Sequence, residues 1–250
     1  MLPSPLHPLD LLVRTLRLHA PLGAAEERAL RALSCTVRTL EAQSYVLREG
    51  DPPAVCAVLV SGFAYRQKLT SDGARQIVSI HMPGDPLDLQ NMFLDVADHS
   101  IQTLTRAEVA FIPRGEFELL ARTDAAIGHA CLMNVLVEAS ISREWVLNVG
   151  RRDSRTRMAH LLCEFAVRLE AHGLVDDYGY DLPMTQELIA DATGLTSVHV
   201  NRTLKGLEAE GLIARNKRKV SIPDWEALRD VADFNLRYLH LEAPRPPLGG

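Results

Sequence analysis

The sequence predicts an α+β protein in which a β-rich half is followed by one long helix and a smaller helical domain. Three observations lead to this prediction. The four glycines between positions 50 and 84 mark turns at even intervals, 12, 11 and 11 residues apart. From Asp124 onward, apolar residues recur at helical spacing. Residues 185–222 read as two short helices followed by a strand hairpin.

Composition limits the class of protein. The 250 residues are 47% apolar and 24% charged, which is typical of a globular chain of about two domains. No uninterrupted apolar run approaches the roughly 18–20 residues of a membrane span, and the first residues lack the basic start of a secretion signal. We therefore expect a cytoplasmic protein that does not enter a membrane. The net charge of −5 argues against a wholly basic surface but permits a local basic patch.

The four cysteines give no sign of a metal site. Cys35, Cys56, Cys131 and Cys163 lie 21, 75 and 32 residues apart, with no Cys-x-x-Cys pair. We therefore expect free thiols, no metal and no metal-containing cofactor.

The N-terminal half begins with helical periodicity over residues 9–34, broken at Pro21–Gly23. Short segments rich in β-formers follow, among them residues 58–60, 77–80 and 109–112. Short strands at 8–12-residue spacing are typical of an antiparallel sandwich or barrel.

The long helix begins after Asp124, a suitable N-cap, and runs for about 27 residues. Apolar residues on two faces predict two partners: the β domain, and the same helix of a second subunit crossing as a parallel coiled coil. The alternative is a helix buried within a monomer. We assign the subunit contact to one stripe: Ile127, Cys131, Asn134, Glu138, Ile141 and Trp145. Residues 150–154 then predict a hinge.

A helix-turn-helix follows. Thr185 can cap the first helix, and Gly194 lies at a sharp turn that favours positive φ. Thr196 can cap the second helix, whose Val200 and Leu204 face inward. Its outward face is rich in groups that can hydrogen-bond base edges in the major groove. These candidates are Ser197, Val198, His199, Asn201, Arg202 and Lys205, with the capping residues Thr185 and Thr196 beside them.

A basic hairpin follows the second helix. Residues 211–214 and 220–222 read as strands, with four positive charges in the five residues between them. A basic tip beside a recognition helix predicts a wing lying along DNA phosphates. The candidate phosphate contacts are Arg215, Lys217, Arg218 and Lys219.

This order of parts resembles the Crp/Fnr superfamily of transcription regulators over roughly residues 25–240. The resemblance is most specific in residues 185–204 and 207–213, and looser in residues 48–51, 60–62 and 83–85. It implies a jelly-roll-like antiparallel β-roll as the sensor domain (1–123), a dimerisation helix and hinge (124–151), a winged helix-turn-helix (152–243) and a disordered tail (244–250). It further implies a homodimer on palindromic double-stranded DNA that recruits or blocks RNA polymerase.

The sequence departs from the best-known members of that family. Where cyclic-AMP-responsive members use Arg, Glu and Arg to read DNA, this chain has Ser197, Val198 and Arg202, so we expect a different operator. The residues corresponding to the effector pocket are Asp88, Leu89, Gln90, His99 and Ser100. Leu89 replaces the carboxylate for the ribose, and His99 replaces the arginine for the cyclic phosphate. We therefore do not expect cyclic AMP as the effector.

The identity of the effector stays open. The N-terminal cysteine cluster of iron–sulfur members is absent. An unrecognised small molecule, or no ligand at all, fits the sequence equally well.

Two other functional classes are alternatives to a DNA-binding regulator. A small-molecule sensor whose winged domain contacts proteins is the main alternative to DNA binding. An enzyme is disfavoured because no nucleophile elbow, phosphate loop or His-Glu-x-x-His occurs.

Overall fold

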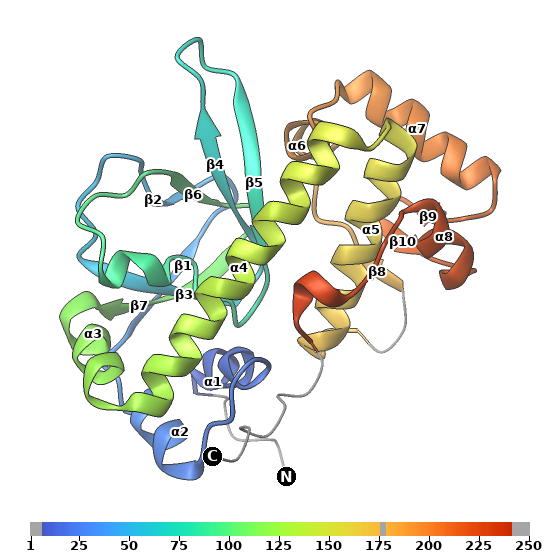
Figure 1. The fold of residues 1–250 in the computed structure, drawn as a ribbon. Helices are drawn as coiled ribbons and strands as arrows, with labels where there is room; N and C mark the ends of the chain where they lie inside the picture. Colours follow the sequence, from blue (N-terminus) through green and yellow to red (C-terminus); the bar gives the residue numbers. More distant parts are fainter. Residues whose placement is uncertain (1–6, 176–178, 242–250) are drawn as a thin grey trace. The chain divides into compact units, whose positions relative to one another are not determined.

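The computed structural model describes residues 7–175 and 179–241, drawn in Figure 1. The chain divides into two compact units. Of the described residues, the N-terminal unit comprises 7–64, 81–139 and 239–241. The C-terminal unit comprises residues 65–80, 140–175 and 179–238.

The N-terminal unit is built on antiparallel strands. A three-stranded sheet has the order β1-β7-β3, and β2 pairs with β6 in a second antiparallel ladder. In the first sheet Arg38 lies opposite Val109, and Val58 lies opposite Ala110. The elements are α1 (Asp10–Arg17), α2 (Ala24–Arg31), β1 (Thr36–Leu40), β2 (Tyr45–Leu47), β3 (Val55–Ser61), η1 (Leu89–Met92), β6 (Ser100–Thr103), β7 (Ala107–Pro113) and α3 (Arg114–Thr123).

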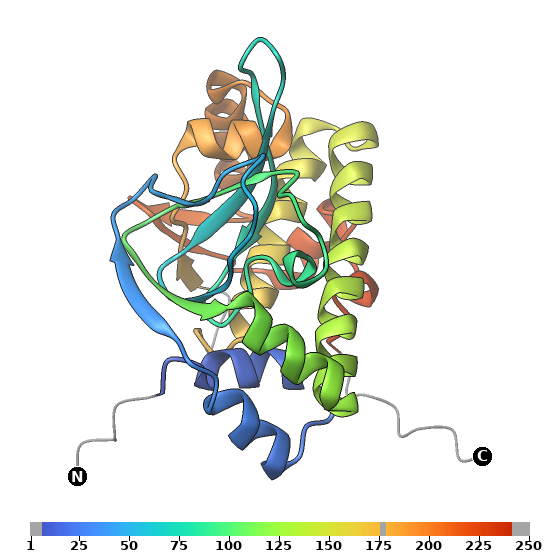
Figure 2. The same ribbon diagram turned by 90° about the vertical axis from the view of Figure 1, so that its left-hand side faces the viewer.

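Apolar packing holds the helices of this unit together. The helices α1, α2 and α3 gather around the beginning of α4 (Ala125–Arg151), as Figure 2 shows. Their shared core contains fully buried Leu12, Leu30 and Phe117, together with Ile127 of α4. Burial of a large apolar side chain of this kind contributes about 1.5–3 kcal/mol.

The C-terminal unit contains the β4–β5 hairpin, the second half of α4, and the remaining helices and strands. A small antiparallel sheet has the order β8-β10-β9. The elements are β4 (Ala64–Leu69), β5 (Arg75–His81), α5 (Ser154–Ala171), β8 (Gly179–Asp181), α6 (Gln186–Thr193), α7 (Ser197–Ala209), β9 (Ala214–Asn216), β10 (Lys219–Ser221), α8 (Trp225–Val231) and η2 (Arg237–Leu239).

The structure confirms the predicted fold class. The long helix has 27 residues, and the Asp124 carboxylate accepts hydrogen bonds from the backbone N–H of Ala126 and Ile127, both at 3.0 Å. Helix α3 and strand β8 were not predicted. The helix break falls later than expected, since α4 continues through Gly150 to Arg151. The predicted tail, residues 244–250, lies outside the described residues.

Candidate nucleic-acid interface

The helix-turn-helix is fixed by the side-chain caps that its sequence predicts. The Thr185 hydroxyl accepts a hydrogen bond from Leu188 N (3.3 Å), and the Thr196 hydroxyl accepts one from His199 N (3.2 Å). Between the helices, Gly194 has φ +64°, which a side chain would strain. Because both threonine hydroxyls are used as caps, these two residues position the helices.

The two sides of α7 differ sharply. Val200 and Leu204 are buried against the rest of the unit. On the opposite side Val198, Arg202 and Lys205 are exposed at spacing i, i+4, i+7, which places them on one stripe. The predicted residues of α7 are brought together around a shallow hollow of about 440 Å³, lined by Gln186, Ser197, Val198, Asn201, Arg202 and Lys205. His199 is partly exposed and lies outside this lining.

The wing differs from its prediction at one residue. Lys217, Arg218 and Lys219 are exposed, and Lys217 has φ +57°, which produces the tight turn. Arg215 instead lies within β9, and its Nη2 binds Glu208 Oε2 of α7 at 2.6 Å. This arginine holds the pKa of the Glu208 carboxyl below its usual value. Arg215 therefore ties the wing to the recognition helix, and the basic tip contains three cations.

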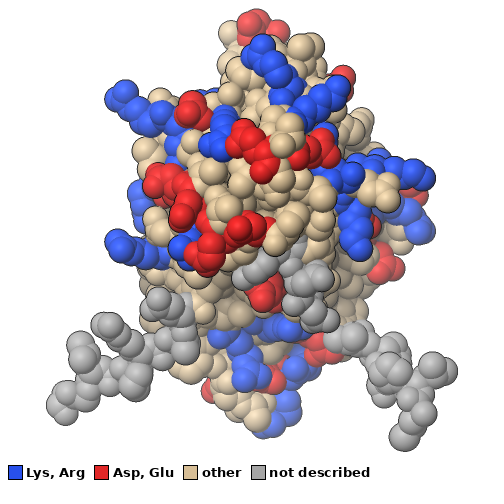
Figure 3. Space-filling view, turned by 90° about the vertical axis from the view of Figure 1, so that its right-hand side faces the viewer, with Lys and Arg blue, Asp and Glu red and all other residues tan. Residues whose placement is uncertain are grey.

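The charge distribution supports a local interface. Figure 3 shows Lys and Arg side chains interspersed with Asp and Glu over the face in view, with no continuous basic field. Affinity for DNA would therefore depend on a few placed cations such as Arg202 and the wing tip.

A single arginine joins the ends of two helices. Arg157 of α5 donates to the backbone carbonyl of Thr193 at the end of α6 (2.6 Å). It also donates to the carbonyls of Asn148 (3.0 Å) and Arg152 (2.9 Å), where α4 ends. These carbonyls have no helical partner. Arg157 therefore connects the helix-turn-helix to the end of the long helix, a role that no sequence signal indicated.

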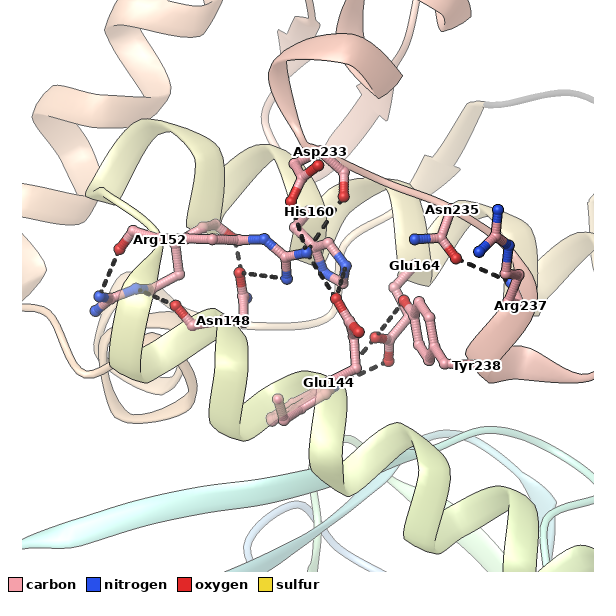
Figure 4. Close-up of polar contacts among 11 residues, drawn as sticks. Glu144, Asn148, Arg152, His160, Glu164, Asp233, Asn235, Arg237 and Tyr238 are labelled. Carbon is pink, nitrogen blue, oxygen red and sulfur yellow. Dashed lines mark hydrogen bonds and ion pairs between the residues drawn. The ribbon is translucent and has the colours of Figure 1, made fainter.

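A buried ionic cluster lies beside this junction (Figure 4). Arg152 Nη2 lies 2.7 Å from Glu144 Oε1 and 3.2 Å from Asp233 Oδ2. His160 Nε2 lies 3.3 Å from the same Glu144 oxygen. Burial and, to a lesser extent, the positive charge of Arg152 lower the pKa of His160 to about 3. His160 is therefore neutral at physiological pH.

Glu164 of α5 is fully enclosed in the same cluster (Figure 4). Its carboxylate accepts hydrogen bonds from Trp145 Nε1 (3.0 and 3.1 Å) and Tyr238 Oη (2.9 Å). Burial raises the pKa of Glu164. These contacts fasten α4, α5 and the C-terminal segment to one another.

The β4–β5 hairpin reaches the first helix of the helix-turn-helix. Arg75 of β5 binds the Asp191 carboxylate of α6, with Nε and Nη2 at 2.7 and 2.6 Å from Oδ2. Gln76 Nε2 lies 3.4 Å from the carbonyl of Ala192. The hairpin is therefore bound to the helix that precedes the recognition helix.

The predicted effector residues lie in the N-terminal unit, and several of them are buried. Asp88 and His99 are buried and face each other, with Oδ1 and Nε2 3.5 Å apart, and His99 Nδ1 also contacts Asp98 at 2.6 Å. Leu89 packs in the apolar core, Gln90 is partly exposed, and the Ser100 hydroxyl accepts a hydrogen bond from Glu49 N at 3.0 Å.

The six residues predicted to form the dimer seam lie on the less exposed side of α4. Ile127 and Cys131 belong to the core of the N-terminal unit, Asn134 is buried, and the Trp145 indole binds Glu164. Glu138 and Ile141 are only partly exposed. This side of α4 is therefore used within the protomer. The opposite side, which includes Leu132, Leu136 and Val146, is the exposed one.

Comparisons with known proteins agree with this geometry. Residues 37–124 match the cyclic nucleotide-binding domain family, and residues 156–231 match the Crp-like helix-turn-helix domain. The transcriptional activator protein FnrL of Cereibacter sphaeroides is 31% identical over 199 residues, which cover 78% of this chain and 79% of FnrL. The nitrogen fixation regulation protein FixK of Bradyrhizobium diazoefficiens is 31% identical over 222 residues, covering 86% and 89%.

The chain belongs to the Crp/Fnr family. Among solved structures, FixK2 from Bradyrhizobium japonicum superposes with a TM-score of 0.74 at 25% identity, covering 80% of this chain and 98% of FixK2. This Crp/Fnr protein is a DNA-binding transcription regulator with a β-roll and a helix-turn-helix.

Helix α4 is long and rich in apolar residues. Among the described residues it is the one helix long and apolar enough to cross a membrane by length and composition, with a mean hydropathy of 1.4. The core helix of a soluble protein also meets this criterion.

Sequence reasoning also missed Gln186. Its side chain begins α6 and lines the hollow with the α7 residues. No local signal marked it, because Gln186 lies at the end of α6 away from the turn at Gly194, and its approach to α7 depends on how the two helices cross.

Proposed function

We propose that this Crp/Fnr regulator acts as a homodimer on a two-fold symmetric DNA site. The observation that carries the proposal is the exposed stripe of α7, which presents hydrogen-bonding and cationic groups around Val198. In a two-fold dimer, two such helices read half-sites about one helical turn apart. The proposed base-reading residues are Ser197, Val198, His199, Asn201, Arg202 and Lys205, with Gln186 beside them. Lys217, Arg218 and Lys219 follow the phosphate backbone.

The exposed side of α4 supports the dimer. Positions along this side of α4 follow one another at alternating spacings of four and three residues, as in a parallel coiled coil. Every position is exposed: Ala125, His129, Leu132, Leu136, Ala139, Arg143, Val146 and Gly150. Leu132, Leu136 and Val146 are 55%, 51% and 74% exposed, an unusual amount for large apolar groups along one line. A second copy of α4 would cover them.

The effector, if the protein uses one, is proposed to differ from cyclic AMP. The carboxylates of Asp88 and Asp98 lie beside His99, which stands at the position of the phosphate-binding arginine of cyclic-AMP-responsive members. A bound phosphate would be repelled by them, and no guanidinium is supplied by position 99. An unidentified small molecule and control by protein abundance are the two remaining possibilities.

Contact with RNA polymerase in the cytoplasm completes the proposal. FnrL is named a transcriptional activator, which favours recruitment of the polymerase over its exclusion. The competing function, a sensor whose winged domain contacts proteins, predicts no affinity for DNA.

Selection of bound sites from random duplex DNA tests the proposal. The purified protein is used with and without cell extract, which would supply an effector. Enrichment of a palindrome is expected, and it should be lost in Arg202→Ala. Arg229→Ala is the matched control, because this arginine of α8 pairs with Glu226 and lies outside the interface. Failure to enrich any palindrome under both conditions would refute the proposal.

A further inference from the structure

Val198 is an apolar residue in a candidate interface whose other residues are polar or charged. Its side chain is 78% exposed, the largest value among the large apolar residues of the described chain. It is also the one apolar residue around the hollow on α7. It lies in the first turn of the helix, where a recognition helix makes its base contacts.

The chemistry of valine restricts what Val198 can meet in the major groove. It has no donor or acceptor, so covering a polar base edge with it would leave that edge without its hydrogen bonds from water. The major groove offers one apolar group, the C5-methyl of thymine. We infer that Val198 determines operator specificity by contacting a thymine methyl in each half-site. This inference rests on the proposed function.

The position of that thymine follows from helix geometry. Arg202 lies one turn after Val198 on the same stripe, about 6 Å further along the axis. Successive base pairs are about 3.4 Å apart. The thymine read by Val198 should therefore lie within two base pairs of the base or phosphate contacted by Arg202.

The expected change in affinity is estimated from the burial of a single methyl group. Removing one buried methyl costs about 0.8 kcal/mol, which corresponds to about a fourfold change in affinity. Two half-sites give about a 15-fold change for the symmetric operator.

Replacement of thymine by uracil tests the inference, because it removes only the methyl group. Each thymine of the selected operator is replaced in both half-sites, and the dissociation constant is measured at one fixed salt concentration for the wild type and Val198→Ala. Since Val198 is exposed, the substitution leaves the core intact. At one thymine per half-site we expect about 15-fold weaker wild-type binding and no change for Val198→Ala. 5-Bromouracil, whose bromine is close in size to a methyl group, should restore wild-type binding.

The outcomes separate this inference from the proposed function. If no uracil substitution weakens the wild type, or if Val198→Ala loses as much as the wild type, the inference is wrong while the palindromic regulator stands. If the initial selection enriches no palindrome with or without extract, both fail.

Discussion

Replacing Arg157 with alanine should destabilise the C-terminal unit and disturb DNA binding. The substitution removes three hydrogen bonds from one guanidinium to the carbonyls of Thr193, Asn148 and Arg152. Hydrogen bonds from a charged donor contribute about 1.5–3 kcal/mol each. The desolvation that lowers the pKa of Arg157 offsets part of this. We therefore expect a loss of about 3 kcal/mol in the free energy of unfolding.

Urea titration measures this loss. Both tryptophans of the chain, Trp145 and Trp225, lie in the C-terminal unit, so intrinsic fluorescence reports on it. With a slope of about 2 kcal/mol per molar urea, the midpoint should fall by about 1.5 M. Arg155→Ala is the matched control, because Arg155 lies on the same helix and pairs with Glu210 at the surface. An exposed pair of this kind contributes about 0–1 kcal/mol, so its midpoint should fall by at most about 0.5 M.

The same two variants connect stability with function. Under conditions where both remain folded, Arg157→Ala should bind the operator more weakly, because the end of α6 is no longer tied to the end of α4. Arg155→Ala should bind like the wild type. Equal urea midpoints for the two variants would refute the argument that Arg157 holds this junction.

Three further predictions concern the neighbouring groups. Glu164→Ala should cost about 4 kcal/mol in urea unfolding, because it leaves two buried donors unpaired, and Glu164→Gln should cost less than half as much. Lys217→Ala should reduce the slope of log affinity against log salt by about 0.9 per wing, while Arg215→Ala, already paired within the chain, should leave it unchanged. His160 binds a proton more readily when unfolded, with a pKa near 6.5, than when folded, with a pKa of about 3. The free energy of unfolding therefore falls as the pH drops below 6.5, and His160 accounts for a loss of about 2 kcal/mol at pH 5. The wild type should lose more stability over that range than His160→Gln.

The helix-turn-helix could be predicted almost residue by residue because its determinants are local. A threonine cap acts within three residues, as Thr185 and Thr196 do. Gly194 provides the positive φ at the turn in its own backbone. None of these features depends on a distant part of the chain.

Helix α3 was missed because its sequence gives weak local signals. It follows Pro113 directly, and Gly115 in its first turn lowers helix propensity. What favours the helix is long-range packing, since Phe117 is fully buried in one core with residues of α1 and α2 that precede it by about 85 to 105 positions. Such contacts cannot be inferred from periodicity over ten residues.

The contacts of single charged groups could not be predicted from the sequence either. Arg215 was counted with the wing cations because four positive charges stand together in the sequence. Its partner, Glu208, lies on the preceding helix, and the pairing depends on how β9 returns toward α7. The approach of Asp88 to His99 likewise depends on the path of the chain between η1 and β6.

The reversed face of α4 shows how a polarity pattern can mislead. The stripe predicted as the subunit seam contains the polar residues Asn134 and Glu138, and polar residues can set the register of coiled coils. In the structure Asn134 and Asn148 are buried within the protomer, and the Asn148 side chain donates to the carbonyl of Arg157 at 3.3 Å. The purely apolar positions Leu132 and Leu136 remain exposed. An apolar side left outside while polar groups are buried reverses the usual arrangement of a surface helix. This arrangement is expected of a helix whose exposed side is covered by a second copy of the same helix. The double variant Leu132→Lys, Leu136→Lys should therefore be a monomer by light scattering. It should also fail to bind a palindromic operator. A dimer that survives both charges would show that the seam lies elsewhere.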